Sequence, residues 1–245
     1  MNEFLQHEKL FNRSPLRTML ADKLAVRDHV SDRIGAEYLS RIYWTGTDLR
    51  DADLDALPLK FVLKANHACR TYQIVRDKSA EDWTALAATA DRWLGHDHSL
   101  KNGEWQYRWI PPTLYIEEFL EQPGEISPVD YKFYCFYGIP RMAVAIHDRT
   151  EGKRRDFVDL DGKTFDCVWG ENTPSGRFVK PESWRQIIEL AGLLADGLAF
   201  VRVDFYALPR IVFGEMTLCP GGGTGRFHPP EKDREVFERH LAGTK

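Results

Sequence analysis

The sequence lacks any apolar run that approaches the roughly 18 residues needed for a membrane-spanning helix. Its first residues are polar and acidic, so we expect no signal peptide. Internal repeats and low-complexity linkers are also lacking. Neither charge sign dominates, since 33 Lys and Arg face 37 Asp and Glu, which argues against a broad nucleic-acid-binding surface. These absences predict a cytoplasmic protein with no membrane insertion and no nucleic-acid partner.

Cysteine is scarce, and no two cysteines form a C-x-x-C pair that would indicate zinc or redox chemistry. The four residues are Cys69, Cys135, Cys167 and Cys219. Two disulfides would be allowed by number, but a cytoplasmic chain of this size rarely needs them. We therefore expect free and mostly buried thiols.

The 245 residues provide enough apolar side chains, 43% of the total, for one large domain or two small ones. Helical patterns are expected in the first fifty residues, after Ser79 and after Pro181. Short extended runs form candidate hairpins at 61–75, 131–146, 157–168 and 200–217. Antiparallel hairpins interleaved with helices predict an α+β fold.

The hairpin at residues 201–217 concentrates charge on one face. Side chains alternate along a strand, so Arg202 and Asp204 share a face. With a turn centred on residues 209–210, Asp204 lies opposite Glu215. Opposed carboxylates repel unless water or a cation separates them, and oxygen ligands of this kind suit Mg²⁺ together with substrate phosphates. The pattern predicts either a magnesium site or an exposed polar face that Arg202 neutralises.

Two lysines also have both a phosphate-binding and a purely structural interpretation. Lys64 ends an apolar strand and enters the loop at residues 65–71, where its ammonium either meets a phosphate or extends into water. Lys132, on an alternating strand, either contacts a phosphate or is a surface charge.

Four segments together resemble the ATP-grasp superfamily, and in particular its TupA-like branch, which is associated with bacterial polysaccharide and teichuronopeptide biosynthesis. They are residues 59–78 (LKFVLKANHACRTYQIVRDK), 115–120 (YIEEFL), 129–140 (VDYKFYCFYGIP) and 200–223 (FVRVDFYALPRIVFGEMTLCPGGG). The resemblance covers roughly residues 20–230 and rests on the order and content of the segments together.

This resemblance implies an ATP-grasp-like fold, in which two α+β lobes with antiparallel sheets enclose a nucleotide site. An N-terminal helical segment, a reduced pre-ATP-grasp region, is expected at residues 1–57. The small lobe, with a phosphate-covering hairpin, is expected at 58–115, and the large lobe, with the metal-binding hairpin, at 116–245.

The resemblance further implies ATP and Mg²⁺ as cofactors and assigns residues to them. Arg202 and Lys132 are the implied catalytic residues, which balance charge on the transferring phosphate. The implied nucleotide-binding residues are Lys64 and Arg70 for phosphate, Glu117, Glu118 and Leu120 for adenine, and Glu121 or Glu125 for ribose. The implied metal ligands are Asp204, Glu215 and Thr217, and the implied acceptor-binding residues are Gly222, Gly223 and Arg226. For the glycine-rich loop, a mobile surface turn is the competing interpretation.

Three features depart from the family pattern. The phosphate loop, usually rich in glycine, reads Ala68-Cys69-Arg70, so either Arg70 replaces backbone amides or ATP binding is impaired. Thr217 stands where the superfamily usually has asparagine and is a weaker metal ligand. The N-terminal region is shorter than in most members, so we expect either a large acceptor or a second subunit, for example in a homodimer, to complete the site.

The implied activity is that of a carboxylate–amine ligase, which forms an amide through an acylphosphate. The substrates would be a small-molecule or saccharide carboxylate and an amine. One rival is a sugar-nucleotide glycosyltransferase, because Asp159-Leu160-Asp161 forms a D-x-D, although Asp161-Gly162 is also a turn signal. Another rival is a non-catalytic binding protein that stacks Trp105, Tyr107 and Trp109, expected on one strand face, against sugar rings.

Overall fold

The chain forms two compact units, each of which combines helices with antiparallel strands. The computed structural model describes residues 1–148, 154–165, 167–170 and 173–231. The five-strand unit comprises Met1–Arg13, Arg27–Leu39 and Glu121–Lys245, and the four-strand unit comprises Ser14–Val26 and Ser40–Leu120. This composition confirms the predicted α+β class. Among the described residues, none of the helices combines the length and apolar character needed to cross a bilayer.

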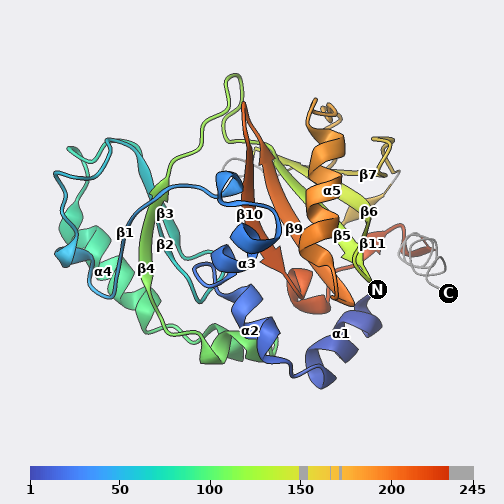
Figure 1. Ribbon diagram of the computed structural model, residues 1–245, viewed down its shortest axis with the longest axis horizontal. Helices are drawn as coiled ribbons and strands as arrows, with labels where there is room; N and C mark the ends of the chain where they lie inside the picture. The colour runs from blue at the N-terminus through green and yellow to red at the C-terminus, as the bar shows by residue number, and fades with distance from the viewer. Residues whose placement is uncertain (149–153, 166, 171–172, 232–245) are drawn as a thin grey trace. The chain divides into compact units, whose positions relative to one another are not determined.

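The four-strand unit contains an antiparallel sheet with the strand order β1-β4-β2-β3 (Figure 1). Its strands are β1 (Ile42–Gly46), β2 (Phe61–Ala65), β3 (Tyr72–Val75) and β4 (Leu114–Glu118). Its helices are α2 (Pro15–Ala21), α4 (Trp83–Leu94) and the short 3₁₀ turns η2 (Leu49–Asp51), η3 (His98–Leu100) and η4 (Trp105–Trp109). The pairing of β2 with β3 confirms the predicted hairpin.

Helix α4 covers this sheet with the apolar face that its sequence pattern predicts. Leu86, Ala87 and Ala90 are buried in the core formed with β2 and β4. The helix begins later than the sequence indicates, because Asp82 caps it by accepting a hydrogen bond from the Ala85 amide at 3.0 Å. Ser79 instead donates its amide and hydroxyl to Asp77, in a separate turn.

The expectation that Trp105, Tyr107 and Trp109 alternate on a strand is wrong. These residues form η4, in which Tyr107 is buried while Trp109 is exposed. Asn102 and Gly103, both with positive φ, turn the chain immediately before η4. η4 packs against α2 and η3, and the differing burial of Tyr107 and Trp109 shows that their rings do not share one exposed face.

The five-strand unit contains an antiparallel sheet with the strand order β10-β9-β5-β6-β7. Its strands are β5 (Asp130–Phe136), β6 (Ile139–His147), β7 (Arg154–Val158), β9 (Phe200–Ala207) and β10 (Ile211–Thr217), and β8 (Val168–Trp169) pairs separately with β11 (Phe227–His228). Its helices are α1 (Asn2–Phe11), α3 (Val26–Arg33), which begins at the unit boundary, α5 (Trp184–Ala195), and the 3₁₀ turns η1 (Ala36–Tyr38) and η5 (Pro220–Gly223).

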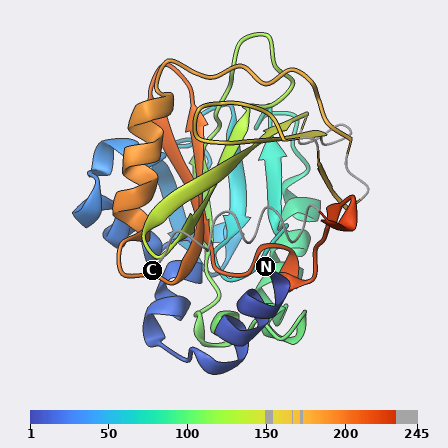
Figure 2. The ribbon, with the colours of Figure 1, turned by 90° about the vertical axis from the view of Figure 1, so that its right-hand side faces the viewer.

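The two faces of this sheet differ. Helix α5 lies along one face, against β5, β6 and β9, in both ribbon views (Figures 1 and 2). Its fully buried residues Ile187, Ala191 and Leu194 follow the predicted 3.6-residue period. The other face contributes to a core that includes Tyr134, Val144 and Phe157 and also carries a row of charged side chains. All four cysteines are free and three are buried, as predicted.

Candidate active site

Asp204 on β9 lies opposite Glu215 on β10, as the sequence predicts. The strand register near the turn, however, differs from the predicted one. Near the turn, Ala207 pairs with Ile211, one residue out of step with the register that the sequence predicts. A bulge at Gly214 shifts the register by one residue, and Asp204 pairs with Glu215. A Cβ atom at Gly214 would lie 3.2 Å from the Asp204 carbonyl oxygen, so the bulge favours glycine.

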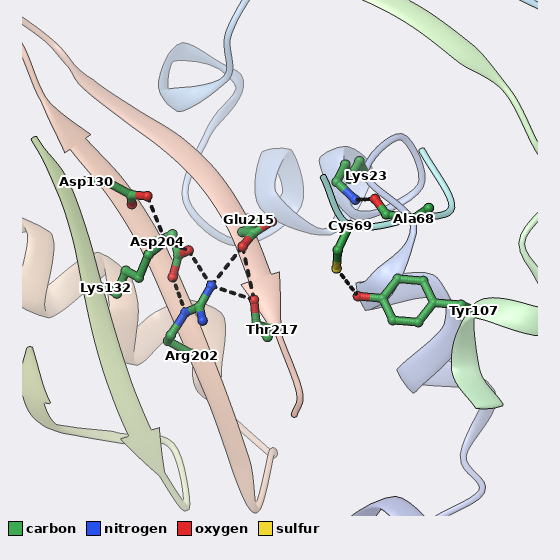
Figure 3. Close-up of polar contacts among 10 residues, drawn as sticks. All are labelled: Lys23, Ala68, Cys69, Tyr107, Asp130, Lys132, Arg202, Asp204, Glu215 and Thr217. Atoms are coloured by element: carbon green, nitrogen blue, oxygen red, sulfur yellow. Dashed lines mark hydrogen bonds and ion pairs between the residues drawn. The ribbon is translucent and has the colours of Figure 1, made fainter. Parts of the chain in front are cut away.

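Arg202 joins these carboxylates through a single guanidinium (Figure 3). Its Nε donates to Asp204 Oδ1 at 2.7 Å and its Nη2 to Asp204 Oδ2 at 2.7 Å. The same Nη2 donates to Glu215 Oε1 at 2.8 Å and to the Thr217 hydroxyl at 2.9 Å. The predicted catalytic arginine and all three predicted metal ligands therefore form one hydrogen-bonded group.

Lys132 extends this group onto β5. Its ammonium is buried, pairs with Asp130 Oδ2 at 2.7 Å and also donates to Asp204 Oδ2. Burial raises the pKa of Asp204 to about 6, although the positive charges of Arg202 and Lys132 lower it. Of the two alternatives for Lys132, the surface charge is excluded because the side chain is buried. Asp130 is a member of the group that sequence reasoning missed.

The donor atoms of this group suit a magnesium ion. Among the described residues, no three His, Cys, Asp or Glu side chains are arranged to hold a metal alone. Mg²⁺, however, is usually bound by one or two carboxylates together with substrate phosphates. Asp204 and Glu215 supply two adjacent carboxylates, so they fit an ion whose remaining ligands come from a nucleotide and water. The assignment of metal ligands stays a prediction.

In the four-strand unit, two predicted nucleotide residues pair with each other. The Lys64 ammonium forms an ion pair with Glu117 on the neighbouring strand, and the Ser40 hydroxyl donates to Glu117 at 2.8 Å. Glu118 accepts from the Arg41 amide at 3.2 Å. These contacts hold Lys64 and Glu117 together at the end of β2.

The β2–β3 loop, which the sequence predicts to be the phosphate loop, is fixed by contacts from elsewhere in its unit. The Lys23 ammonium donates to the Ala68 carbonyl at 2.6 Å (Figure 3), and the Asn66 amide group donates to Asp22 at 2.9 Å. Cys69 Sγ lies 3.5 Å from the Tyr107 hydroxyl. Arg70 adopts a positive φ of 65° and exposes its side chain. Sequence reasoning missed Lys23, because it lies some 45 residues before the loop that it contacts.

The predicted acceptor loop is partly buried, with Gly222 and Gly223 inside and Gly221 and Thr224 exposed. Gly221, Gly222 and Gly223 all have positive φ, between 60° and 73°, which only glycine adopts readily. Lys9 Nζ donates to the Gly222 carbonyl at 3.1 Å, and Gln6 Nε2 donates to the carbonyls of Gly222 and Gly223 at 3.0 Å. Figure 2 shows α1 (dark blue) beside this turn (red). Helix α1 therefore positions the glycine-rich loop, which the sequence did not indicate.

Arg226, Leu120, Glu121 and Glu125 are the remaining predicted site residues. Arg226 exposes its side chain and accepts through its carbonyl from the Gly170 amide. Leu120 and Glu121 fall on opposite sides of the unit boundary, and Glu125 is half-buried in the five-strand unit. The D-x-D has a structural explanation, since the Asp159 carboxylate accepts from the amides of Asp161 and Lys163 at 3.0 and 2.8 Å and closes a turn.

Comparison with solved structures finds relatives of low sequence identity. The D-alanine–D-alanine ligase from Bacillus anthracis complexed with ATP is 14% identical, with a TM-score of 0.48 over 82% of this chain and 54% of that one. The ATP-grasp ligase PsnB complexed with minimal precursor, Mg and ADP is 13% identical, with a TM-score of 0.46 over 84% of this chain and 52% of that one. The chain thus spans about half the length of these proteins.

Comparison at the level of sequence gives the family. No curated protein sequence matches the chain. The family model described as TupA-like ATPgrasp matches residues 3–240, nearly the whole sequence. The segments that carry the resemblance, the hairpin with its paired carboxylates and the glycine-rich loop all lie within this match. The chain belongs to the TupA-like ATP-grasp family.

Proposed function

We propose that this protein is an ATP- and Mg²⁺-dependent ligase that joins a carboxylate to an amine. The observation that carries the proposal is the group on one face of β5, β9 and β10, where Asp204 and Glu215 lie side by side with Arg202 and Lys132. Clustered cations beside paired carboxylates suit phosphoryl transfer, in which catalysis consists mostly of positioning and charge stabilisation. Membership of the ATP-grasp family supports ATP as the phosphoryl donor.

In the proposed reaction, a carboxylate oxygen of the acceptor attacks the γ-phosphorus of ATP, and ADP leaves. The amine nitrogen then attacks the acyl carbon of the acylphosphate, inorganic phosphate leaves, and the nitrogen loses a proton to form the amide. Asp204 and Glu215 would hold Mg²⁺, which when bound would supply positive charge to the phosphate oxygens. Arg202 and Lys132 carry the fixed positive charges that stabilise the transferring group.

We assign the other predicted residues within this proposal. In the four-strand unit, Lys64 contacts phosphate, Glu117 and Glu118 contact adenine, and Arg70 replaces part of the missing glycine amides. In the five-strand unit, the amides of Gly222 and Gly223 contact the acceptor carboxylate. A saccharide or small-molecule acceptor, a role in polysaccharide biosynthesis and a cytoplasmic location complete the proposal.

A ligand screen followed by a trapping assay tests the function. ATP with Mg²⁺ is expected to raise the melting temperature, because a ligand that binds the native state stabilises it, while UDP-glucose is expected to leave it unchanged. Incubation with ATP, hydroxylamine and a panel of acidic sugars and amino acids should then yield an acyl hydroxamate with ADP. UDP-glucose hydrolysis without any response to ATP would instead favour a glycosyltransferase, and nucleotide binding without ADP release would favour a binding protein.

A further inference from the structure

Arg155 shares a sheet face with the charged group already described. The register pairs Asp130 with Ile146 and Ile146 with Arg155, so these three residues form a row across β5, β6 and β7. Residues directly opposite one another in an antiparallel sheet point to the same side. Arg155 therefore lies on the face that carries Asp130 and Lys132, whereas its neighbour Arg154 lies on the other face and is exposed.

Arg155 differs from the other cations of this face because no carboxylate among the described residues pairs with it. Lys132 pairs with Asp130 and Asp204, and Arg202 pairs with Asp204 and Glu215. The Nε atom of Arg155 is buried and has no hydrogen-bond partner within the described part of the chain. Burial lowers the pKa of Arg155, the Tyr134 hydroxyl raises it and the charge of Arg202 lowers it further, so burial outweighs the one favourable neighbour.

Tyr134 pairs with Arg202 in the register of β5 and β9 and so lies on the same sheet face as Arg155. Burial raises the pKa of the Tyr134 hydroxyl, while the charges of Arg202 and Arg155 lower it and the charge of Asp204 raises it. Arg155, Arg202 and Tyr134 thus share this face, and no carboxylate of the described residues forms an ion pair with Arg155. An unpaired charge that is partly removed from water is costly, and an anion would remove that cost.

We infer that Arg155 is an anion-binding residue that receives a carboxylate or phosphate group of a substrate. Its planar guanidinium offers several donors in the geometry that both groups accept in pairs. The inference rests on the proposed function only for the identity of the molecule that carries the anion, which would be either the acceptor or the nucleotide. The competing explanation is that the aliphatic part of Arg155 packs while its head points to water.

Calorimetric titration of the full chain with inorganic phosphate and, separately, with succinate tests the inference. At least one of these probes should bind the natural protein. Arg155→Met should weaken that binding by about tenfold or more, the usual effect of losing a charged hydrogen bond. Arg154→Met serves as the matched control and should bind as the natural protein does, and Arg155→Lys should retain part of the affinity.

The stability of the variants separates binding from packing. Because Arg155 has no carboxylate partner among the described residues, Arg155→Met should leave the melting temperature unchanged or higher, while a structural role would lower it. An effect on phosphate alone assigns the site to the nucleotide side, and an effect on succinate alone assigns it to the acceptor. Equal binding of both probes by Arg155→Met and the natural protein, or no binding of either probe, would overturn the inference.

Assays of ADP release distinguish this inference from the proposed function. If the natural protein never releases ADP but its anion binding depends on Arg155, the ligase proposal fails and the anion site stands. If ADP is released and anion binding does not depend on Arg155, the ligase proposal is supported and the anion site is contradicted.

Discussion

Arg202 and Asp204 form a doubly hydrogen-bonded ion pair along a single strand. The two residues are separated by one position in β9, and both bonds measure 2.7 Å. Alternation along a strand places them on one face, and Asp204 is only 1% exposed. The same guanidinium reaches Glu215, so it offsets the repulsion between the two carboxylates and fixes their orientation.

Replacing Asp204 by Asn should abolish ATP-dependent turnover, lowering it by about a hundredfold or more, while the fold is kept. The fold survives because Lys132 still pairs with Asp130, and Arg202 with Glu215. ADP release and circular dichroism measure the two effects. Asp196→Asn, which affects only a surface pair with Arg33, is the control and should not change turnover. Unchanged ADP release in Asp204→Asn would contradict the assignment.

Replacing Lys132 by Met should lower the free energy of unfolding by about 3–5 kcal/mol, because it removes a buried cation that pairs with two buried carboxylates, Asp130 and Asp204. The double variant Lys132→Met with Asp130→Asn should recover part of this loss, since one of the two carboxylates becomes neutral. Urea denaturation measures both. Arg185→Met breaks an exposed ion pair with Glu189 and should change stability by less than about 1 kcal/mol. A similarly small effect of Lys132→Met would contradict the buried network.

Stability should depend on pH through His98. Burial, followed by the charges of His96 and Lys23, lowers the pKa of His98 from 6.5 to about 4. The unfolded chain therefore takes up a proton at a higher pH than the folded chain, and the free energy of unfolding should fall by up to about 3 kcal/mol as the pH drops from about 6.5 to about 4.

His98→Phe should remove this contribution while keeping the edge-on packing against Tyr107, whose ring centroid lies 4.7 Å from that of His98. Urea denaturation at several pH values, compared between the two proteins, measures the difference. Parallel pH profiles would show that His98 titrates normally in the folded state.

Replacing Lys9 by Met should loosen the glycine-rich loop. The substitution removes a buried donor to the Gly222 carbonyl, and the expected loss of stability is about 1–3 kcal/mol. Hydrogen exchange should accelerate in the amides of residues 219–225 more than in α5. His7→Gln, on the exposed side of α1, is the control and should leave exchange unchanged. Equal acceleration throughout the unit would show that α1 supports the fold without positioning this loop.

Sequence reasoning identified most of the charged group, because alternation and cross-strand pairing are local rules. It paired Asp204 with Glu215 correctly because two differences cancel. The register near the turn is offset by one residue from the predicted one, and the bulge at Gly214 shifts it back by one residue. The same rules failed for Trp105 to Trp109, where alternation in the sequence occurs in a 3₁₀ helix. A short pattern cannot show whether a neighbouring strand exists to pair with it.

The sequence by itself determined the α+β class, the amphipathic helices and the side chains that share a face of each strand, because these depend on periods of 3.6 and 2 residues. Only the tertiary structure decided which distant residues meet. Asp130 joins Lys132, α1 anchors the glycine-rich loop, and Lys23 fixes the β2–β3 loop. Arg155 shares a face with the charged group but pairs with no carboxylate in the described part of the chain. These relationships depend on strand order and on contacts between segments far apart in the chain, which no local period encodes.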